Sequence, residues 1–217
     1  MKVILIAKKN KPYVNKVISL TKQLFQNTIY FDAEKKINFK EIIDLNCDII
    51  FSYISGQILS SKVLDNTSLY NINFHPGSTE YPGFGCFNFA LYNKAKYYGC
   101  TAHLMNRRVD TGRIIDERNF VISKNETVLS LSKKTYKQMY LQFKNVASYL
   151  SKNKKIKITN NKWKRKPYKK IQFEKLCKLH LKMSKNEIHN RIQATCYPNK
   201  PGAYLNFKGY KFKIIKK

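Results

Sequence analysis

The sequence of 217 residues lacks the features that mark secreted, membrane-spanning and zinc-binding proteins. Its cysteines are odd in number, contain no CxxC pair and lie in or beside apolar runs: Cys47, Cys86, Cys100, Cys177 and Cys196. This pattern favours reduced, buried thiols over a disulfide framework or a zinc site. No segment approaches the roughly 20 apolar residues that span a bilayer, and the apolar run near the N-terminus is too short for a signal sequence. We therefore expect a soluble, cytoplasmic protein with no metal and no membrane partner.

Acidic residues are also scarce, since 13 Asp and Glu face 42 Lys and Arg, for a net charge of +29. Such a charge suits a polyanionic partner. The lysines are spread along the chain and do not form a stripe, so we favour a general composition bias with most lysines on solvated faces. One alternative stays open, a nucleic-acid-binding module that uses NKWKRKPYKK with Trp163 and Tyr168 as stacking groups.

Three common catalytic and phosphate-binding motifs are missing. No GxGxxG follows the first apolar run, and GxxxxGK[ST] and GxSxG do not occur. Dinucleotide-binding, P-loop NTPase and nucleophile-elbow interpretations therefore lose their main support. Two segments remain that carry chemistry: NINFHPGSTEYPGFGCFNFALYN from Asn71, and VDTGRII from Val109.

The first two thirds of the chain alternate between strand and helix patterns. Short apolar runs predict strands at 2–7, 28–31, 47–54, 69–74, 101–105 and 113–122. Apolar residues at helical spacing predict helices at 14–25, 39–45, 60–64, 86–92 and 127–150. Strands that alternate with helices favour an α/β fold with a mostly parallel sheet.

The composition changes from residue 151, where a basic, apolar-poor segment predicts a linker or a strand that follows the surface. A helix at 184–193 and a hairpin at 203–215, turning at Lys208 and Gly209, are expected beyond it. We therefore divide the chain into a catalytic domain at 1–152 and a small C-terminal α+β module at 153–217.

Asn73 and His75 lie at the end of a predicted strand, and ligands of such sheets bind at the carboxyl ends of the strands. Strand side chains alternate, so both residues face the same side. An imidazole suits proton transfer near neutral pH. An amide N–H beside it can stabilise a developing oxyanion.

Asp110 follows the strand at 101–105, in a turn where Gly112 permits a tight bend. A carboxylate there would favour the imidazolium form of His75 and fix its tautomer. The set contains no nucleophile, so we expect direct attack of a substrate amine on a bound acyl donor. Taken singly, His75 is more often a structural histidine and Asp110 a turn residue.

In order and spacing these segments resemble the folate-dependent formyltransferases. The features shared are the Asn-x-His-Pro strand end, the helix after it, the strand GCTAH at 99–103 and the turn DTG at 110–112. The resemblance covers roughly residues 1–125 and implies a Rossmann-like formyltransferase core. It implies N10-formyltetrahydrofolate as co-substrate and Asn73, His75 and Asp110 as the catalytic residues.

Three branches of that family are compared. Methionyl-tRNA formyltransferases suit the charge but carry an additional C-terminal barrel, and glycinamide ribonucleotide formyltransferases have a different loop after the histidine. The loop here is similar to that of the sugar N-formyltransferases, as is the C-terminal RIQATCYPNKPGAYLNFKGYKFKI. That branch implies a nucleotide-linked, commonly dTDP-linked, 3- or 4-amino-dideoxy sugar, and a place in O-antigen or lipopolysaccharide biosynthesis.

The same resemblance implies binding residues. Folate is expected to contact Gln57, Ile58, Leu59, Arg108 and Asp110, and the sugar nucleotide is expected to contact Tyr81, Gly83, Phe84, Gly85, Asn88 and Lys8. For each of the latter taken alone, packing or solvation is an equal or better interpretation. A homodimer stays open, nucleic acid is not expected as a partner, and a relative that has lost activity is disfavoured because all three catalytic residues are present.

Overall fold

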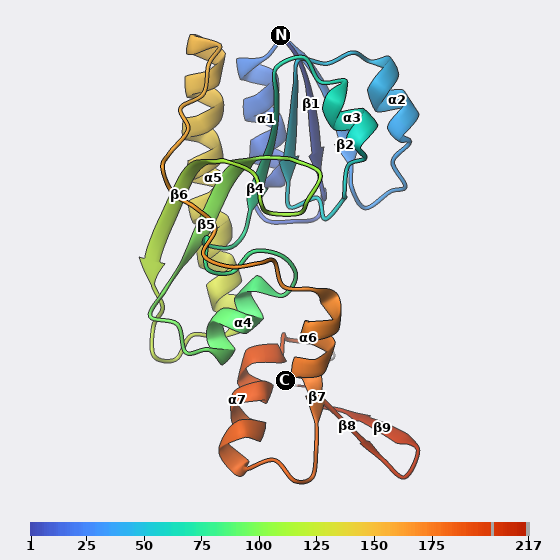
Figure 1. The fold of residues 1–217 in the computed structure, drawn as a ribbon, viewed down its shortest axis with the longest axis vertical. Coiled ribbons are helices and arrows are strands. Elements are labelled where there is room, and N and C mark those ends of the chain that lie inside the picture. The colour runs from blue at the N-terminus through green and yellow to red at the C-terminus, as the bar shows by residue number, and fades with distance from the viewer. Residues whose placement is uncertain (201, 216–217) are drawn as a thin grey trace.

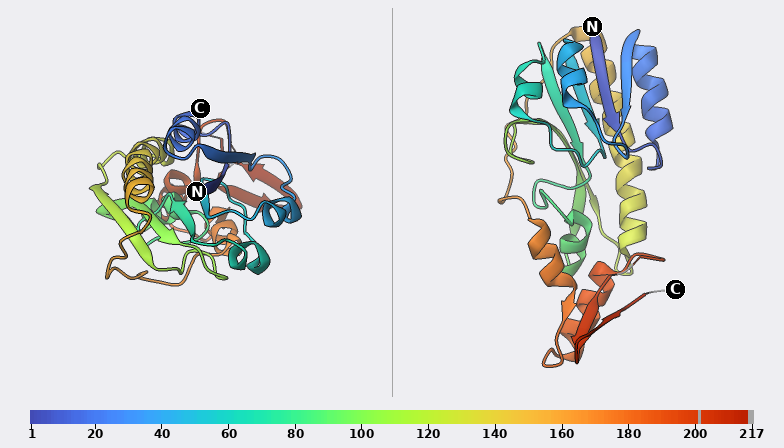
Figure 2. Two further views of the ribbon diagram at one scale, coloured as in Figure 1. Left: turned by 90° about the horizontal axis from the view of Figure 1, so that it is seen from above. Right: turned by 90° about the vertical axis from the view of Figure 1, so that its right-hand side faces the viewer.

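The computed structural model describes residues 1–200 and 202–215. It is elongated, with a large sheet in the upper part and the last elements of the chain below it (Figure 1). The second view of Figure 2 shows that these last elements lie at the end of the molecule opposite the N-terminus.

The large sheet has six strands in the order β2-β1-β3-β4-β5-β6. The first four are parallel, and β5 and β6 are antiparallel to their neighbours. The predicted mostly parallel α/β sheet is therefore confirmed. Its strands are β1 (Lys2–Ala7), β2 (Asn27–Asp32), β3 (Ile49–Tyr53), β4 (Tyr70–His75), β5 (Tyr97–Leu104) and β6 (Ile114–Val121).

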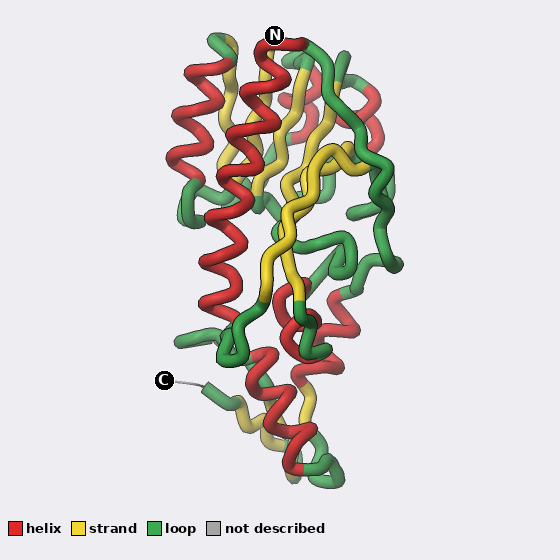
Figure 3. The backbone as a smooth tube through the Cα atoms, turned by 90° about the vertical axis from the view of Figure 1, so that its left-hand side faces the viewer, coloured by secondary structure: helices red, strands yellow, loops and turns green. Residues whose placement is uncertain are grey.

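Helices cover both faces of this sheet. They are α1 (Val14–Leu24), α2 (Phe39–Asp44), α3 (Ser61–Asp65), α4 (Cys86–Tyr92) and α5 (Val128–Asn153). Figure 3 shows α1 and α5 side by side on one face. Alternate residues of β1 divide between two apolar clusters, since Val3 and Leu5 pack with Phe143 of α5 while Ile4 and Ile6 pack with Ile42 of α2. The continuous apolar strands predicted from the sequence are thus buried on both faces.

β5 begins four positions before its predicted start at residue 101. Residues 97–100 lie before the predicted start because Gly99 is a poor strand former, although Tyr97 and Tyr98 favour a strand. In the structure they pair with Val121, Phe120, Asn119 and Arg118 of β6. A Cβ on Gly99 would lie 2.0 Å from the carbonyl oxygen of Arg118, so the glycine permits this close pairing.

After α5 the chain runs back along the sheet through residues 154–169, which we call the strap. It is followed by α6 (Lys170–Cys177), β7 (Lys178–Leu179), α7 (Lys185–Thr195), β8 (Tyr204–Phe207) and β9 (Tyr210–Lys213). The predicted helix and the hairpin at Lys208 and Gly209 are present, and α6 and β7 were not predicted.

The division after residue 152 stays a prediction, and it falls in the last turn of α5. Pro201, Lys216 and Lys217 of the proposed module lie outside the described residues. Within the part of the chain that the structure describes, no helix combines the length and hydropathy needed to cross a bilayer.

Candidate active site

β4 ends at His75, at the edge where the carboxyl ends of β1 and β3 also lie. Asn73 of β4 is paired with His103 of β5, so their side chains lie on the same face. A bulge between Ala102 and His103 interrupts the β5 ladder at this point. Bulges re-aim side chains beside functional sites, and here the bulge turns His103 toward the end of β4.

Asp110 lies at the centre of this group. Its Oδ2 atom is 3.2 Å from Nδ1 of His75 and accepts the Gly83 N–H at 2.7 Å. Its Oδ1 atom is 3.2 Å from Nε2 of His103 and accepts from the Asn73 amide at 3.4 Å. The structure therefore brings Asn73, His75 and Asp110 together, as the sequence pattern led us to expect.

The turn that carries Asp110 is conformationally restricted. Asp110 adopts a left-handed backbone with φ of 46°, which costs free energy for a residue other than glycine. A Cβ on Gly112 would lie 1.7 Å from the carbonyl oxygen of Leu104, so only glycine fits there. The carboxylate is thus held by backbone geometry as well as by its hydrogen bonds.

His75 faces acceptors with both nitrogens. Nδ1 faces the Asp110 carboxylate and Nε2 lies 3.0 Å from the carbonyl oxygen of Tyr81. Both contacts are hydrogen bonds only when both nitrogens carry a proton. With both protons present, His75 pairs with the buried Asp110 carboxylate through Nδ1 and holds its Nε2 proton against the Tyr81 carbonyl oxygen, from which it can be donated once that contact opens.

The charges around Asp110 set its protonation. Burial by itself would raise the pKa of this carboxyl, but the charge on His75, the hydrogen bond and charge of His103, and the Gly83 N–H outweigh it. They hold the pKa of Asp110 well below its usual range. Asp110 is therefore an anion at neutral pH although its side chain is only 5% exposed.

We expect the low pKa of Asp110 to make the fold sensitive to acid. An Asp with a depressed folded-state pKa stabilises the fold above its unfolded pKa, about 3.9, and this stabilisation is lost as pH falls further toward the folded value. Urea unfolding of wild type and Asp110→Asn at several pH values checks this. The difference in free energy of unfolding between the two should be largest near neutral pH and shrink below about pH 4. A difference that is equal at every pH would contradict it.

His103 belongs to the cluster, although the sequence analysis used it only as part of GCTAH. Its Nδ1 donates to the carbonyl oxygen of Leu104 at 2.8 Å. Its Nε2 lies 3.1 Å from the Asn73 amide nitrogen and 3.2 Å from Oδ1 of Asp110. The Asn73 amide nitrogen thus has two partners within the cluster, His103 at 3.1 Å and the Asp110 carboxylate at the longer distance of 3.4 Å.

The residues expected to contact folate are only partly placed for it. Ile58 is 71% exposed and Arg108 is exposed, so both can meet a ligand. The Gln57 amide donates to the carbonyl oxygen of Ala33 at 3.1 Å. Leu59 is packed in the apolar cluster beneath α2 and α3, so its side chain faces the core, and its contact with folate stays a prediction.

Of the residues expected to contact the sugar nucleotide, Tyr81 and Gly83 contact the cluster through their backbones. Phe84 is 47% exposed, and Gly85, with φ of 74°, precedes the first turn of α4. The Asn88 amide donates to the carbonyl oxygen of Ala194 at 2.7 Å and ties α4 to α7, and its contact with the sugar nucleotide stays a prediction.

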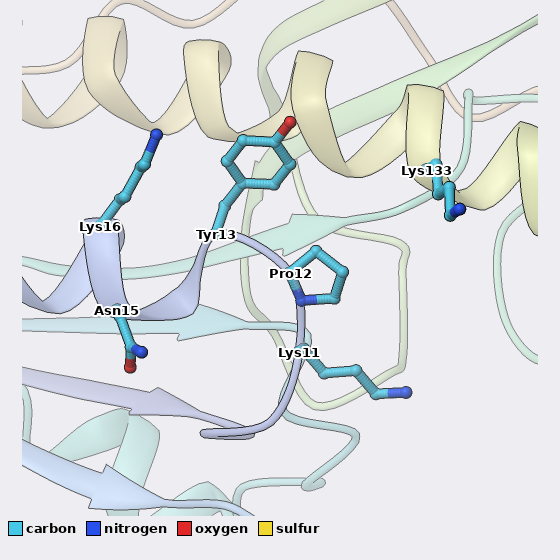
Figure 4. Close-up of a pocket in the computed structure, with 6 residues that line it drawn as sticks. All are labelled: Lys11, Pro12, Tyr13, Asn15, Lys16 and Lys133. Atoms are coloured by element: carbon cyan, nitrogen blue, oxygen red, sulfur yellow. The ribbon is translucent and has the colours of Figure 1, made fainter.

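A hollow of about 540 Å³ lies between the start of α1 and α5, lined by Lys11, Pro12, Tyr13, Asn15, Lys16 and Lys133. In the view of Figure 4, Lys16 and Lys133 lie on opposite sides of the Tyr13 ring. Burial and the nearby charges of Lys200 and Lys8 lower the pKa of Lys11. Lys8 itself lies away from this lining, with its ammonium beside Gly56. The hollow is therefore cationic and suits an anionic group.

The strap also reaches the cluster. The Trp163 ring packs edge-on against His75 and His103, and Tyr168 is buried and stacked on Phe89 at 3.7 Å. Both aromatic side chains have internal partners. The nucleic-acid alternative thus loses the stacking groups on which it depended.

The cysteine side chains lie in the protein interior. All five cysteines are free and buried. Burial raises the pKa of Cys86 to about 11 and that of Cys100 to about 12, so neither is a thiolate at neutral pH. Across residues 1–200 and 202–215, no group of three or more His, Cys, Asp or Glu side chains is arranged to hold a metal ion.

Comparisons with known proteins show which proteins this chain is similar to. Residues 3–147 match the formyl transferase family. The chain is 33% identical over 195 residues to the bifunctional polymyxin resistance protein ArnA of Wigglesworthia glossinidia brevipalpis, a match that covers 86% of this chain and 29% of that protein. The chain thus spans less than a third of this relative's length.

Two solved structures share the fold over nearly their whole length. A sugar N-formyltransferase from Shewanella sp. is matched with a TM-score of 0.82 at 21% identity, covering 100% of this chain and 97% of that one. An N-formyltransferase from Helicobacter canadensis, in complex with folinic acid and dTDP-3-aminofucose, is matched with a TM-score of 0.71 at 17% identity, covering 98% and 97%.

Proposed function

Because this chain belongs to the formyl transferase family, we propose that it transfers a formyl group from N10-formyltetrahydrofolate to the amine of a nucleotide-linked amino sugar. The acceptor is a 3- or 4-amino-dideoxy sugar carried on dTDP. The observation that carries the proposal is the cluster in which Asp110 contacts both His75 and Asn73. The ligands of the Helicobacter canadensis structure support both substrate classes.

Folate fits the loops that follow β3 and β5. The exposed side chains of Ile58 and Val109, 71% and 46% exposed, offer apolar surface for a planar ring. These loops lie beside the cluster, since Val109 directly precedes Asp110. We assign the donor to this side of the site.

The sugar nucleotide is assigned to the other side. The cationic hollow formed by Lys11, Lys16 and Lys133 suits the diphosphate, because lysine ammonium groups bind phosphate oxygens as point charges. The exposed ring of Phe84, beside Phe173 of α6, offers apolar surface for the sugar or base. Phe84 and Gly83 remain the proposed contacts from the loop after His75.

The roles of the three residues follow from their contacts. The sugar amine attacks the formyl carbon, and an N–H of Asn73, turned from its 3.4 Å contact with Asp110 to the substrate, stabilises the negative charge that develops on the formyl oxygen. His75 gives its Nε2 proton to N10 of the folate as the carbon–nitrogen bond breaks, and it recovers a proton from the attacking amine. Asp110 keeps its charge throughout and holds His75 in the orientation that both transfers need.

We expect a formylated sugar nucleotide to form only when both substrates are present. The experiment incubates the protein with N10-formyltetrahydrofolate and a panel of dTDP- and UDP-linked amino sugars, glycinamide ribonucleotide and methionyl-tRNA. Mass spectrometry then detects the gain of one formyl group. Formylation of glycinamide ribonucleotide or methionyl-tRNA alone would assign the chain to another branch, and no product with any acceptor would overturn the proposal.

A further inference from the structure

The chain has one tryptophan, Trp163, and the strap carries it to the active-site cluster. The strap is held on the sheet by backbone hydrogen bonds. Thr159 N–H donates to the carbonyl oxygen of Ile114 at 2.8 Å, and Lys164 N–H donates to that of Thr79 at 3.0 Å. Trp163 is thus anchored on both sides, by β6 and by the loop that follows His75.

Trp163 contacts three parts of the cluster. Its Nε1–H donates to the carbonyl oxygen of Gly112 at 2.8 Å, in the turn that carries Asp110. Its ring lies 5.9 Å from the His75 ring at 71° and 5.1 Å from the His103 ring at 85°. One side chain therefore contacts both imidazoles and also binds the backbone two residues beyond the carboxylate.

These contacts have two physical effects. The indole hydrogen bond fixes the position of the Asp110 turn, which Gly112 already holds tightly against Leu104. The ring also covers the imidazoles, which have only 6% and 2% of their side-chain surface exposed. Excluding water strengthens the attraction between imidazolium and carboxylate, because the effective dielectric constant falls.

We propose that Trp163 is a positioning residue of the transferase site. It holds the Asp110 turn and shields the His75–Asp110 pair, and it acts through these two residues without touching either substrate. This role rests on the proposed function, since it presumes that His75 moves protons during formyl transfer.

The groups around the ring fit this role. His75 and His103 face it on the cluster side. On its other side Trp163 lines a hollow of about 670 Å³, together with Glu117 of β6 and Lys162 and Lys164 of the strap. Glu117 accepts from Thr79 N–H and from the Asn161 amide, so its charge is already engaged.

The kinetic test compares Trp163→Ala, Trp163→Phe and the strap control Lys162→Ala. Trp163→Ala should lower kcat about tenfold, because misplacing a catalytic group by a fraction of an ångström costs rate at the chemical step. Trp163→Phe keeps an aromatic ring but loses the hydrogen bond to Gly112. Its kcat should therefore lie between those of the wild type and Trp163→Ala. KM for both substrates should change less than about threefold, since binding contacts are kept. A large rise in KM with kcat unchanged would mean that Trp163 binds substrate, and it would overturn the proposal.

A second readout does not depend on activity. The His75 N–H that is bonded to Asp110 should give a low-field proton resonance in NMR spectra, assigned by its loss in His75→Asn. It should persist in wild type and Lys162→Ala and be lost from Trp163→Ala by exchange with water, while circular dichroism shows that the fold is kept. Persistence of the resonance in folded Trp163→Ala would overturn the shielding role.

If Trp163→Ala does not fold, loss or retention of kcat in Trp163→Phe decides the proposal. If no acceptor is formylated by the wild type, the proposed function fails, and the resonance still tests what Trp163 does to the cluster.

Discussion

Replacing His75 by alanine is expected to lower kcat for formyl transfer by roughly 10²–10⁴-fold, the usual contribution of a positioned acid–base group. The variant removes a side chain that contacts the Asp110 carboxylate through one ring nitrogen and the Tyr81 carbonyl oxygen through the other. The proton that N10 of the folate requires then has to come from water. Steady-state kinetics with the acceptor found in the panel measures the effect.

The matched control is His189→Ala, because His189 is an exposed histidine on α7. It should keep wild-type kcat and stability. Asn73→Ala is the companion variant and should lower kcat by about 10²–10³-fold, as the loss of one oxyanion donor does. If His75→Ala retained more than about a tenth of wild-type kcat, the role assigned to His75 would be wrong.

The fold could be predicted from the sequence where the spacing of apolar residues in a segment matches the faces that the folded protein buries. β1 is apolar on both faces, and its predicted and observed ranges coincide because both faces are covered by helices. The antiparallel direction of β5 and β6 was not predictable in this way. A buried strand has the same composition in either direction, and its direction depends on how the chain returns after α4.

The three residues proposed as catalytic could be identified from the sequence because they lie in two short, distinctive segments at the ends of β4 and β5. His103 was missed as a site residue although its strand was predicted. The alternation of side chains along a strand does not by itself show which face of the sheet carries the site. The signal was available in the alternation of Thr101 and His103 opposite His75 and Asn73. Pairing register, which a single sequence does not show, is what turns that alternation into a contact.

Trp163 was beyond the reach of pattern analysis for a different reason. Its neighbours in sequence are lysines, arginine and asparagine, so the local composition indicates a solvated linker. Its partners, Gly112 and the two histidines, lie more than fifty positions away in the chain. The contact arises because α5 is long enough to carry the chain to the top of the sheet, and the strap returns along the sheet to the site (Figure 1).

Gly77→Ala should disturb His75 directly, because Gly77 lies in the loop that follows this histidine. A Cβ at this position would lie 2.5 Å from Nε2 of His75 and 2.7 Å from the carbonyl oxygen of Tyr81. These are the two atoms that form the His75–Tyr81 hydrogen bond, so the methyl group would be forced between donor and acceptor. The loop has little freedom to retreat, because Thr101 donates to the carbonyl oxygen of Gly77 at 2.8 Å and Tyr98 donates to that of Pro76 at 2.7 Å.

We therefore expect Gly77→Ala to lower kcat by about 10²-fold, as a displacement of roughly 1 Å at a reacting group does. Its free energy of unfolding should fall by about 1–3 kcal/mol, the usual cost of overpacking. Ser78→Ala is the control, since the Ser78 hydroxyl is buried without a hydrogen-bond partner and its loss breaks no bond. Steady-state kinetics and urea unfolding of both variants separate the effect on kcat from the effect on the free energy of unfolding. A Gly77→Ala protein with reduced stability but normal kcat would show that His75 keeps its position without the Tyr81 contact, and the proton donor would then have to be oriented by Asp110 alone.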